Sequence, residues 1–204
     1  MTRPRRTYTT KRVDQRREEL SDRLVDIVLA DGFAELSIEE LARRLHCSKS
    51  SLYRIADSKE KIIVVAVRRF FRRAAERVET RLLREEGDAP ERIRTYLTAI
   101  AVELAPASPA FFADLDAWDT TAQIYRDNTA IAADRVRQLV GDALPASARP
   151  QAAFVGAVAA QVMEAIHRGD MNASAGLTDS DAYRALADLI VRALPPTPHP
   201  RGDA

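Results

Sequence analysis

Cysteine, histidine and glycine are scarce in this sequence of 204 residues, and each shortage excludes a kind of site. The single cysteine, Cys47, rules out a disulfide within the chain and fits a reducing compartment, so we expect a cytoplasmic protein. The three histidines, His46, His167 and His199, do not have the spacing of metal ligands. The seven glycines form neither a glycine-rich phosphate loop nor a Gly-x-Ser-x-Gly motif. We therefore expect no metal site, no cofactor and no enzymatic activity.

Long apolar runs are missing as well. No stretch approaches about 18 uninterrupted apolar residues, so the sequence predicts no membrane-spanning helix. The opening residues, MTRPRRTYTTKR, hold no apolar core of the length that a signal peptide needs. No window alternates apolar and polar residues over the length of a strand, whereas the abundant Ala, Arg, Leu and Glu favour helix. With 46% hydrophobic residues the chain can bury a core, and we expect an all-α fold.

The net charge of +1 conceals an asymmetry along the chain. Residues 1–86 carry 21 Lys and Arg against 15 Asp and Glu, whereas residues 87–204 carry 10 against 15. A basic first part beside an acidic second part is expected if only the first part meets a polyanion. Ordinary variation of surface charge explains the asymmetry equally well, so this feature assigns no partner alone.

Capping residues, prolines and glycines divide the chain into nine expected helices. The first begins at a cap on Asp14 and ends at Asp31-Gly32, and a loop from Asp170 to Leu177 precedes the last. Residues 1–13 are expected to form a disordered basic arm, and residues 196–204 a flexible tail. The helices are expected near residues 14–31, 38–45, 48–55, 59–85, 90–104, 109–115, 121–144, 150–168 and 178–194.

The segment from Ser37 to Lys61 holds two short amphipathic helices joined by a tight turn at His46-Cys47. Ser37 begins a capping-box pattern, and Ser48 is placed to cap the second helix. That helix offers Leu52 to a core and leaves small polar and basic side chains free near its start. A helix of this kind is short enough to enter the major groove of DNA, which is about 12 Å wide.

This segment resembles the DNA-binding domain of the tetracycline-repressor (TetR) family of bacterial transcription regulators. It departs from the family where His46 replaces a usual glycine, where Ser50 replaces a glycine or similar small residue, and where Arg54-Ile55 replace His-Phe. Because the turn often requires a positive φ, a side chain at His46 is expected either to change the turn slightly or to strain it. The matching features are, in order, Gly32-Phe33, Ser37-Ile38-x-x-Leu41-Ala42, Cys47-Ser48-x-x-x-Leu52-Tyr53 and Ser58-Lys59-Glu60-Lys61-Ile62.

The resemblance implies a helix-turn-helix domain over residues 14–60 and a ligand-sensing and dimerisation domain over residues 61–195. It assigns Tyr53 and Lys59 to backbone phosphates of double-stranded DNA. Arg43 and Arg44 either flank the groove or pair with a glutamate on their own helix. The implied DNA-binding residues are Ser37, Arg43, Arg44, Ser48, Lys49, Ser50, Ser51, Tyr53, Arg54 and Lys59.

The basic arm over residues 1–13 has two interpretations. Its arginines could enter a minor groove beside the site that the helix-turn-helix reads. They could equally stay solvated and add only non-specific attraction to DNA. The sequence leaves both open.

The last two expected helices are rich in alanine and apolar over nearly their whole surface, as in AAFVGAVAAQVMEAIH. A helix of that composition must be covered on two sides. The resemblance implies a homodimer in which these helices form a four-helix bundle and place two recognition helices on a palindromic site. The residues expected at the interface are Phe154, Val155, Val158, Val162, Leu186, Ile190 and Val191.

The middle of the chain combines aromatic residues with isolated polar groups. An apolar cavity with a few polar groups is typical of a ligand pocket, although an ordinary aromatic core has the same composition. The resemblance implies a repressor that a small, largely apolar ligand releases from DNA. The alternative is a DNA-binding regulator without a small-molecule effector, controlled by a protein partner or by its abundance. The candidate pocket residues are Tyr96, Glu103, Phe111, Phe112, Trp118, Tyr125, Gln161, Met163 and His167.

Overall fold

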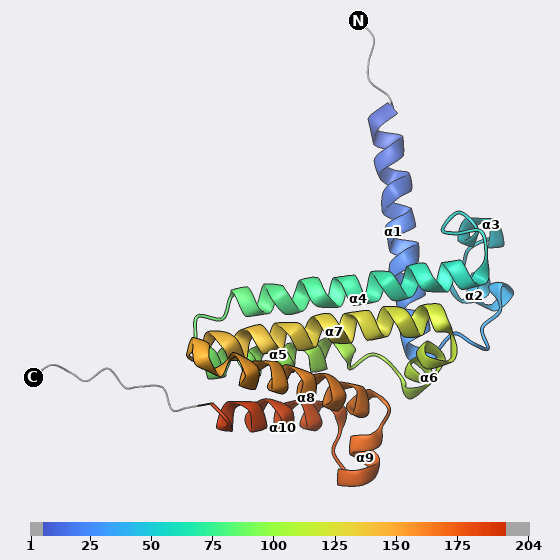
Figure 1. Ribbon diagram of the computed structural model, residues 1–204. Helices are drawn as coiled ribbons and strands as arrows, with labels where there is room; N and C mark the ends of the chain where they lie inside the picture. Colours follow the sequence, from blue (N-terminus) through green and yellow to red (C-terminus); the bar gives the residue numbers. More distant parts are fainter. Residues whose placement is uncertain (1–5, 195–204) are drawn as a thin grey trace, which may run out of the picture. The chain divides into compact units, whose positions relative to one another are not determined.

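The computed structural model describes the backbone of residues 6–194 and the side chains from residue 16 onward. In this range all regular structure is helical, as expected, and no strand is present. Figure 1 shows the course of the chain. The α-helices are α1 (Arg6–Asp31), α2 (Ile38–Arg44), α3 (Lys49–Leu52), α4 (Lys59–Leu83), α5 (Ala89–Leu104), α6 (Pro109–Ala117), α7 (Asp119–Asp142), α8 (Arg149–His167), α9 (Asp170–Ala175) and α10 (Asp179–Arg192), with a 3₁₀ turn at Ala146–Ala148.

The chain forms two compact units. Unit 1 contains the residues up to Ala74 and the segment Pro106–Arg126, and unit 2 contains Ala75–Ala105 and the residues from Asp127 onward. These units divide the chain differently from the expected domains, because unit 1 takes in the first half of α4 together with α6. The resemblance-based division near residue 60 stays a prediction about function.

Unit 1 is organised around the end of α1. Gly32 adopts a φ of 76°, and its amide donates to the carbonyl of Val28 at 3.0 Å, which closes the helix. Asp114 of α6 accepts hydrogen bonds from the amides of Phe33 and Ala34, the latter at 2.8 Å. A Cβ at Gly32 would lie 2.5 Å from an Asp114 carboxylate oxygen, so the close approach of α6 also requires glycine there. Phe33 is 1% exposed.

Aromatic rings pack together beside the contact between the end of α1 and α6. Phe33 meets Trp118 edge to face at 4.9 Å between ring centroids, and Phe70 meets Phe111 in the same manner at 5.8 Å. Edge-to-face pairs at such distances contribute about 0.5–1.5 kcal/mol beyond the burial of their surface. Helices α1, α4 and α6 are therefore held to one another by a common apolar core.

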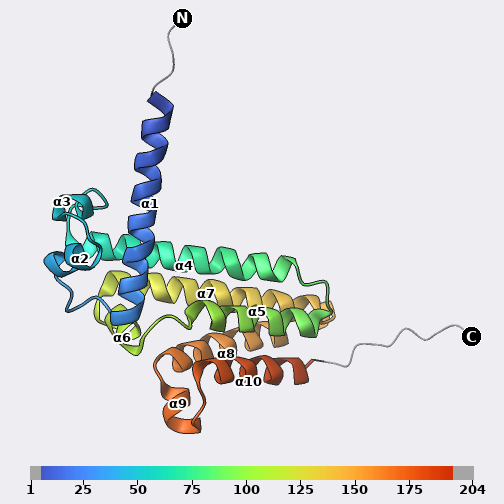
Figure 2. The same ribbon diagram turned by 180° about the vertical axis from the view of Figure 1, so that it is seen from behind.

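Unit 2 is a helical bundle. Helix α10 packs along α5 and α8, and Figures 1 and 2 show these three helices side by side. Gly156 lets α8 approach α7 closely, because a Cβ there would lie 2.9 Å from the Cβ of Arg137 and 3.2 Å from the carbonyl of Ala133. At the edge of the bundle, an ion pair joins Arg77 of α4 to Glu103 of α5 at 2.5 Å. Two further ion pairs join other helices of this unit.

Two sequence-based expectations about helix bounds are wrong. Helix α1 begins at Arg6 rather than at Asp14, because residues 6–13 hold no proline or glycine that would stop it. The expected arm thus has helical backbone over residues 6–13, while residues 1–5 and the expected tail at 196–204 lie outside the described residues.

The segment Asp170–Ala175, expected as a loop, is helix α9, so the described chain has ten α-helices rather than nine. Left-handed glycines stand at both of its ends, Gly169 with φ 80° and Gly176 with φ 67°. Between them no proline or glycine interrupts the turn. Gly169 follows α8 and Gly176 ends α9, and the six residues between the two glycines form one further helix.

Candidate nucleic-acid interface

Helix α2 begins at the predicted serine cap. The hydroxyl of Ser37 accepts a hydrogen bond from the amide of Glu40 at 3.1 Å, which satisfies one of the free amides of the first turn. The other half of the expected capping box is absent, because the Glu40 carboxylate instead accepts from Arg43 at 2.6 Å and from Arg44 at 2.7 Å. These two hydrogen bonds lower the pKa of Glu40 to about 2.

The turn between α2 and α3 has the strained conformation that the sequence predicts. His46 has a φ of 50°, the positive value that glycine normally supplies. The amide of Cys47 donates to the carbonyl of Ala42 at 3.0 Å and closes the turn. Burial raises the pKa of the Cys47 thiol, which disfavours a reactive thiolate.

Three serine hydroxyls gather at the start of α3. Ser48 caps the helix by accepting from the amide of Ser51 at 3.2 Å, and its hydroxyl lies 2.8 Å from that of Ser50 and 2.9 Å from that of Ser51. Leu52 is fully buried, whereas the next residue, Tyr53, is 48% exposed. Helix α3 ends at Leu52, three residues before the expected end, and a turn continues the segment to Ile55.

The charged residues of the motif are mostly paired within the chain. Lys49 pairs with Glu39, and both side chains are more than half exposed. Arg43 and Arg44 share Glu40, so the alternative in which they pair on their own helix is the arrangement found, and Arg44 also reaches Asp31. Arg54 is exposed and makes no ion pair with any described residue.

Lys59 has partners that its sequence position did not indicate. Its ammonium group donates to the carbonyl of Ala34 at 2.8 Å and lies 5.6 Å from the centroid of the Trp118 ring. Both contacts hold the start of α4 within unit 1. Its implied contact with a DNA phosphate stays a prediction.

The candidate pocket residues are divided between the two units. In unit 1, Phe111 and Phe112 pack at 5.5 Å between centroids, Phe112 and Tyr125 at 6.1 Å, and Trp118 on Phe33, so these rings fill space against one another. Such packing agrees with the ordinary aromatic core that the sequence left open, and a ligand pocket at these residues stays a prediction.

In unit 2 the remaining candidates have several different environments. Tyr96 and Met163 are part of the buried core, and Glu103 is buried against Arg77. His167 is buried with its Nε2 atom 3.1 Å from the hydroxyl of Tyr183, and desolvation lowers its pKa to about 4. Gln161 is exposed.

The residues expected at a dimer interface also separate into two groups. Leu186 and Ile190 are 3% and 4% exposed, because they pack in the core of their own chain and are not available to a second copy. Phe154 is 69% exposed, and Val155, Val158, Val162 and Val191 are half-buried. Sequence reasoning missed Leu189, which is 63% exposed on α10. Its signal was an apolar residue about one turn from Leu186, beside the buried face of the same helix.

Neither a metal cluster nor a single membrane-spanning helix is found among the described residues. No group of three or more His, Cys, Asp or Glu side chains is arranged to hold a metal ion there. Nor is any single helix in that range both long and apolar enough to cross a membrane, although α5 and α6 taken together pass that test by length and composition.

Solved structures with a similar fold are transcriptional regulators. One from Saccharomonospora viridis, solved in complex with choline, has a TM-score of 0.65 and 15% identity over 89% of this chain and 98% of that chain. A TetR-like regulator from Rhodococcus sp. RHA1 has a TM-score of 0.59 and 19% identity over 86% and 94% of the two chains. A TetR-family regulator from Thermus thermophilus has a TM-score of 0.56 and 19% identity over 87% and 99%.

No model of a known protein family matches the sequence, and no curated protein matches it. The similarity to the solved structures covers nearly the whole chain, so this chain has the fold of TetR-family transcriptional regulators. The resemblance inferred from the helix-turn-helix motif is thereby confirmed at the level of the fold.

Proposed function

We propose that this protein is a DNA-binding transcriptional regulator that reads duplex DNA with α3 and the turn that follows it. One observation carries the proposal: Leu52 is anchored in the core of unit 1 while Tyr53 beside it is 48% exposed. An anchored helix with exposed polar neighbours is what insertion into a major groove requires.

The individual roles follow from exposure and pairing. Tyr53 and Arg54 are exposed and carry the groups best suited to phosphate and base edges. Ser48, Ser50 and Ser51 supply hydroxyls that can exchange their mutual hydrogen bonds for bonds to DNA. The side chains of Lys49 and Arg43 reach DNA only by leaving Glu39, which is exposed, and Glu40, which is half-buried; this costs little because ion pairs near the surface are weak.

The test begins with selection of binding sites from random duplexes by the full-length protein. Arg54→Ala is expected to weaken binding to the selected site about 10-fold or more, the cost of one charge-assisted contact. Arg94→Ala, which removes an equally exposed arginine from α5, should leave affinity within about twofold. If both variants bind like the wild type, or if no duplex is enriched, the proposed reading surface is wrong.

We further propose that the regulator acts as a homodimer through α8 and α10. Phe154 and Leu189 are large apolar side chains that remain exposed on these two helices. A palindromic site requires two α3 helices about 34–36 Å apart, one turn of DNA, and a dimer can supply the two copies. A Phe154→Ser, Leu189→Ser variant should sediment as a folded monomer, whereas Leu83→Ser, at another exposed apolar position, should not. A wild type that sediments as a monomer contradicts the dimer.

Release by a small ligand is the remaining part of the proposal. The structural relative solved with choline supports an effector for this chain. Differential binding to two states of the dimer would weaken DNA binding roughly 5- to 150-fold, at a coupling of about 1–3 kcal/mol. The close ring packing of Phe111, Phe112 and Tyr125 favours the alternative, a regulator without such an effector. A screen of metabolites for joint effects on melting temperature and DNA affinity separates the two.

A further inference from the structure

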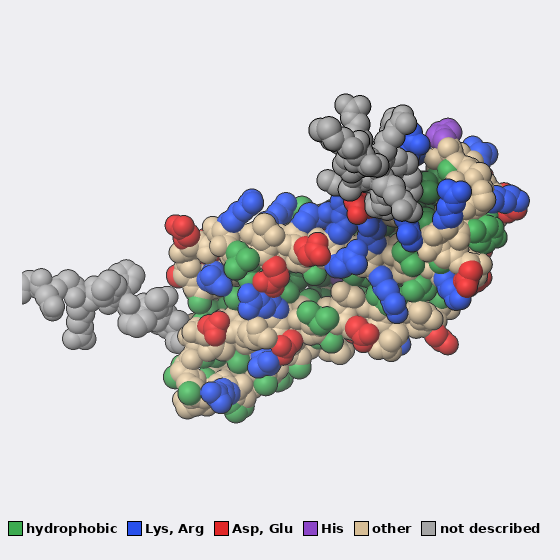
Figure 3. All heavy atoms as spheres, turned by 90° about the horizontal axis from the view of Figure 1, so that it is seen from above, with side chains coloured by type: hydrophobic (Ala, Val, Ile, Leu, Met, Phe, Trp, Pro, Cys, Tyr) green, Lys and Arg blue, Asp and Glu red, His purple; other side chains and the backbone are tan. Residues whose placement is uncertain are grey.

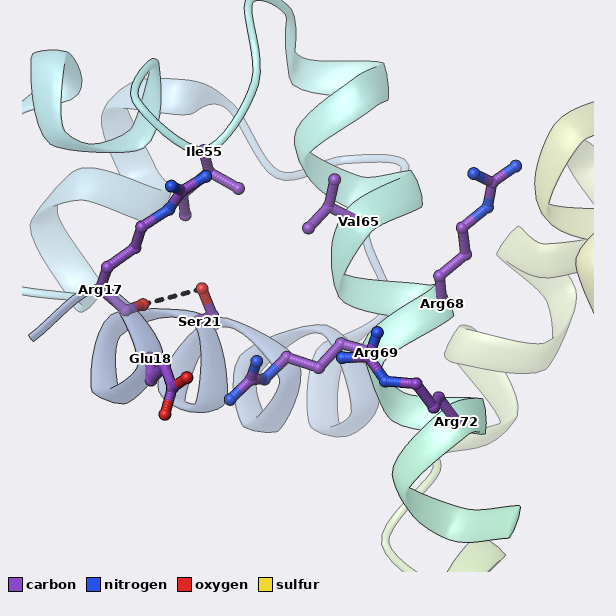
Figure 4. A pocket seen from close by; sticks show the side chains of 8 residues that line it. All are labelled: Arg17, Glu18, Ser21, Ile55, Val65, Arg68, Arg69 and Arg72. Atoms are coloured by element: carbon purple, nitrogen blue, oxygen red, sulfur yellow. Dashed lines mark hydrogen bonds between the residues drawn. The ribbon is translucent and has the colours of Figure 1, made fainter. Parts of the chain in front are cut away.

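A cleft lined by arginines lies within unit 1, between the middle of α1, the segment after α3 and the first half of α4. Its volume is about 580 Å³, within the range of about 300–1,000 Å³ that small-molecule sites occupy. No function proposed above uses it, because the candidate pocket residues lie elsewhere in the chain. Figure 4 shows the lining residues, which are Arg17, Glu18, Ser21, Ile55, Val65, Arg68, Arg69 and Arg72.

The positive charge of the cleft is only partly neutralised. Arg69 pairs with Asp22 of α1 at 2.6 Å, and Arg73 competes for the same carboxylate. Arg17 and Arg72 are exposed and make no ion pair with any described residue. Glu18 is the single acid among the lining residues. Four arginines against one acid give the cleft an excess of positive charge, so it is favourable for an anion.

The geometry suits a phosphate. In Figure 4, Arg69 and Arg72 extend from α4 toward α1, and Arg17 rises from α1 toward Ile55, so these three guanidinium groups come from two facing walls; Arg68 points away from them. Guanidinium groups bind phosphate through two parallel N–H bonds, which makes arginine the preferred residue for this recognition. Figure 3 shows that Lys and Arg side chains are frequent on the face of the molecule that includes α4.

One wall of the cleft is apolar. Ile55 is half-buried, and Val65 is 39% exposed although it is a large hydrophobic residue. Both lie on the side of the cleft opposite α1. A molecule that carries phosphate groups at one end and a ring or apolar body at the other would satisfy both walls.

We propose that this cleft binds a phosphorylated small molecule, with its phosphate groups on Arg17, Arg69 and Arg72 and its apolar part on Ile55 and Val65. The ligand would bridge α1 and α4, the two helices that Asp22 and Arg69 already connect, and these helices flank the α2–α3 motif. The site is distinct from the effector pocket that the fold suggests. Its existence does not depend on whether the protein binds DNA.

The experiment measures binding by the full-length protein without DNA. Inorganic pyrophosphate and ATP serve as probes in calorimetric titrations, one carrying phosphate groups alone and the other adding a ring. We expect both to bind, ATP more tightly, and the double variant Arg17→Ala, Arg72→Ala to bind at least about 10-fold more weakly. The matched control is Arg81→Ala, Arg84→Ala, which removes two exposed arginines from the far end of α4 and its flank and should change affinity less than about twofold.

Three results would overturn the proposal. The wild type could bind neither probe at millimolar concentration, the cleft variant could bind like the wild type, or the control variant could lose as much affinity as the cleft variant. A further arm distinguishes the source of the phosphate. If the cleft variant loses affinity for duplex DNA with a shallower salt dependence, while the wild type binds neither probe, the cleft serves the DNA backbone instead. Circular dichroism melts confirm that each variant is folded.

Discussion

The ammonium group of Lys59 lies over the ring of Trp118, 5.6 Å from its centroid, and donates a hydrogen bond to the carbonyl of Ala34. We expect Lys59→Met to lower the free energy of unfolding by about 1–2 kcal/mol, because both the cation–π contact and the hydrogen bond are lost. Urea denaturation measures the change.

The control for this prediction is Lys61→Met. Lys61 pairs with Asp57, and both side chains are mostly exposed, so its loss should cost less than about 0.5 kcal/mol. If both variants lose the same free energy of unfolding, the contacts of Lys59 contribute no stability. Binding a DNA phosphate would then be the remaining predicted role of this lysine.

His46→Gly is expected to stabilise the protein. A non-glycine residue at a φ of 50° costs about 1–2 kcal/mol, and the greater flexibility of glycine in the unfolded chain offsets about 0.5–1 kcal/mol of the gain. His46→Ala removes the imidazole but keeps the strained backbone, so it should not stabilise. Thermal melts compare the two, and an equal gain from alanine would locate the strain in the side chain rather than in the backbone.

Two glycines in helices should respond to alanine in opposite directions. At Gly156 a new Cβ would meet side-chain and backbone atoms of α7 at 2.9 and 3.2 Å, so Gly156→Ala should destabilise by about 1–3 kcal/mol. At Gly141 the nearest atom is the Cβ of Ala152 at 3.9 Å, so Gly141→Ala should gain up to about 1 kcal/mol of helix propensity. Chemical denaturation measures the free energy of unfolding of both variants. A stabilised Gly156→Ala would mean that α7 and α8 can move apart enough to accept the new Cβ.

Stability should decrease in mild acid because of His167. Burial lowers its pKa to about 4 from 6.5. At a pH between these two values, the unfolded chain therefore binds a proton at this residue and the folded chain does not. The free energy of unfolding therefore falls as the pH drops through this window, by roughly 2 kcal/mol between about pH 7.5 and about pH 5 from this group. His167→Gln should flatten that part of the pH profile. An unchanged slope would show that folding does not lower the pKa of His167.

The sequence predicted best those features that depend on neighbouring residues. The caps at Ser37 and Ser48 and the positive φ of His46 are local properties, and the structure confirms each of them. The all-helical class followed from composition and is confirmed too. The predicted start of α1 and the loop predicted in place of α9 were wrong, because residues of moderate helix propensity also form helix where no proline or glycine stops them.

Contacts between distant segments could not be predicted in this way. Nothing near Lys59 indicates that Trp118 lies beside it, and Arg17 and Arg72 line one cleft only after α1 and α4 have packed. The apolar stripe of α10 could be seen in the sequence, but not which of its residues the same chain covers. Leu186 was therefore assigned to an interface although it is buried in its own unit, and Leu189 was overlooked.

Helix α9 is bounded by two left-handed glycines, and a Cβ built on either one meets no atom within 4 Å. A side chain at Gly169 or Gly176 is therefore disfavoured by the left-handed backbone conformation and not by a lack of space. A D-alanine prefers a positive φ and would be relaxed at both positions, whereas an L-alanine would be strained at each. The limits of α9 are thus set by chirality, the one property that mirror-image amino acids of identical size do not share.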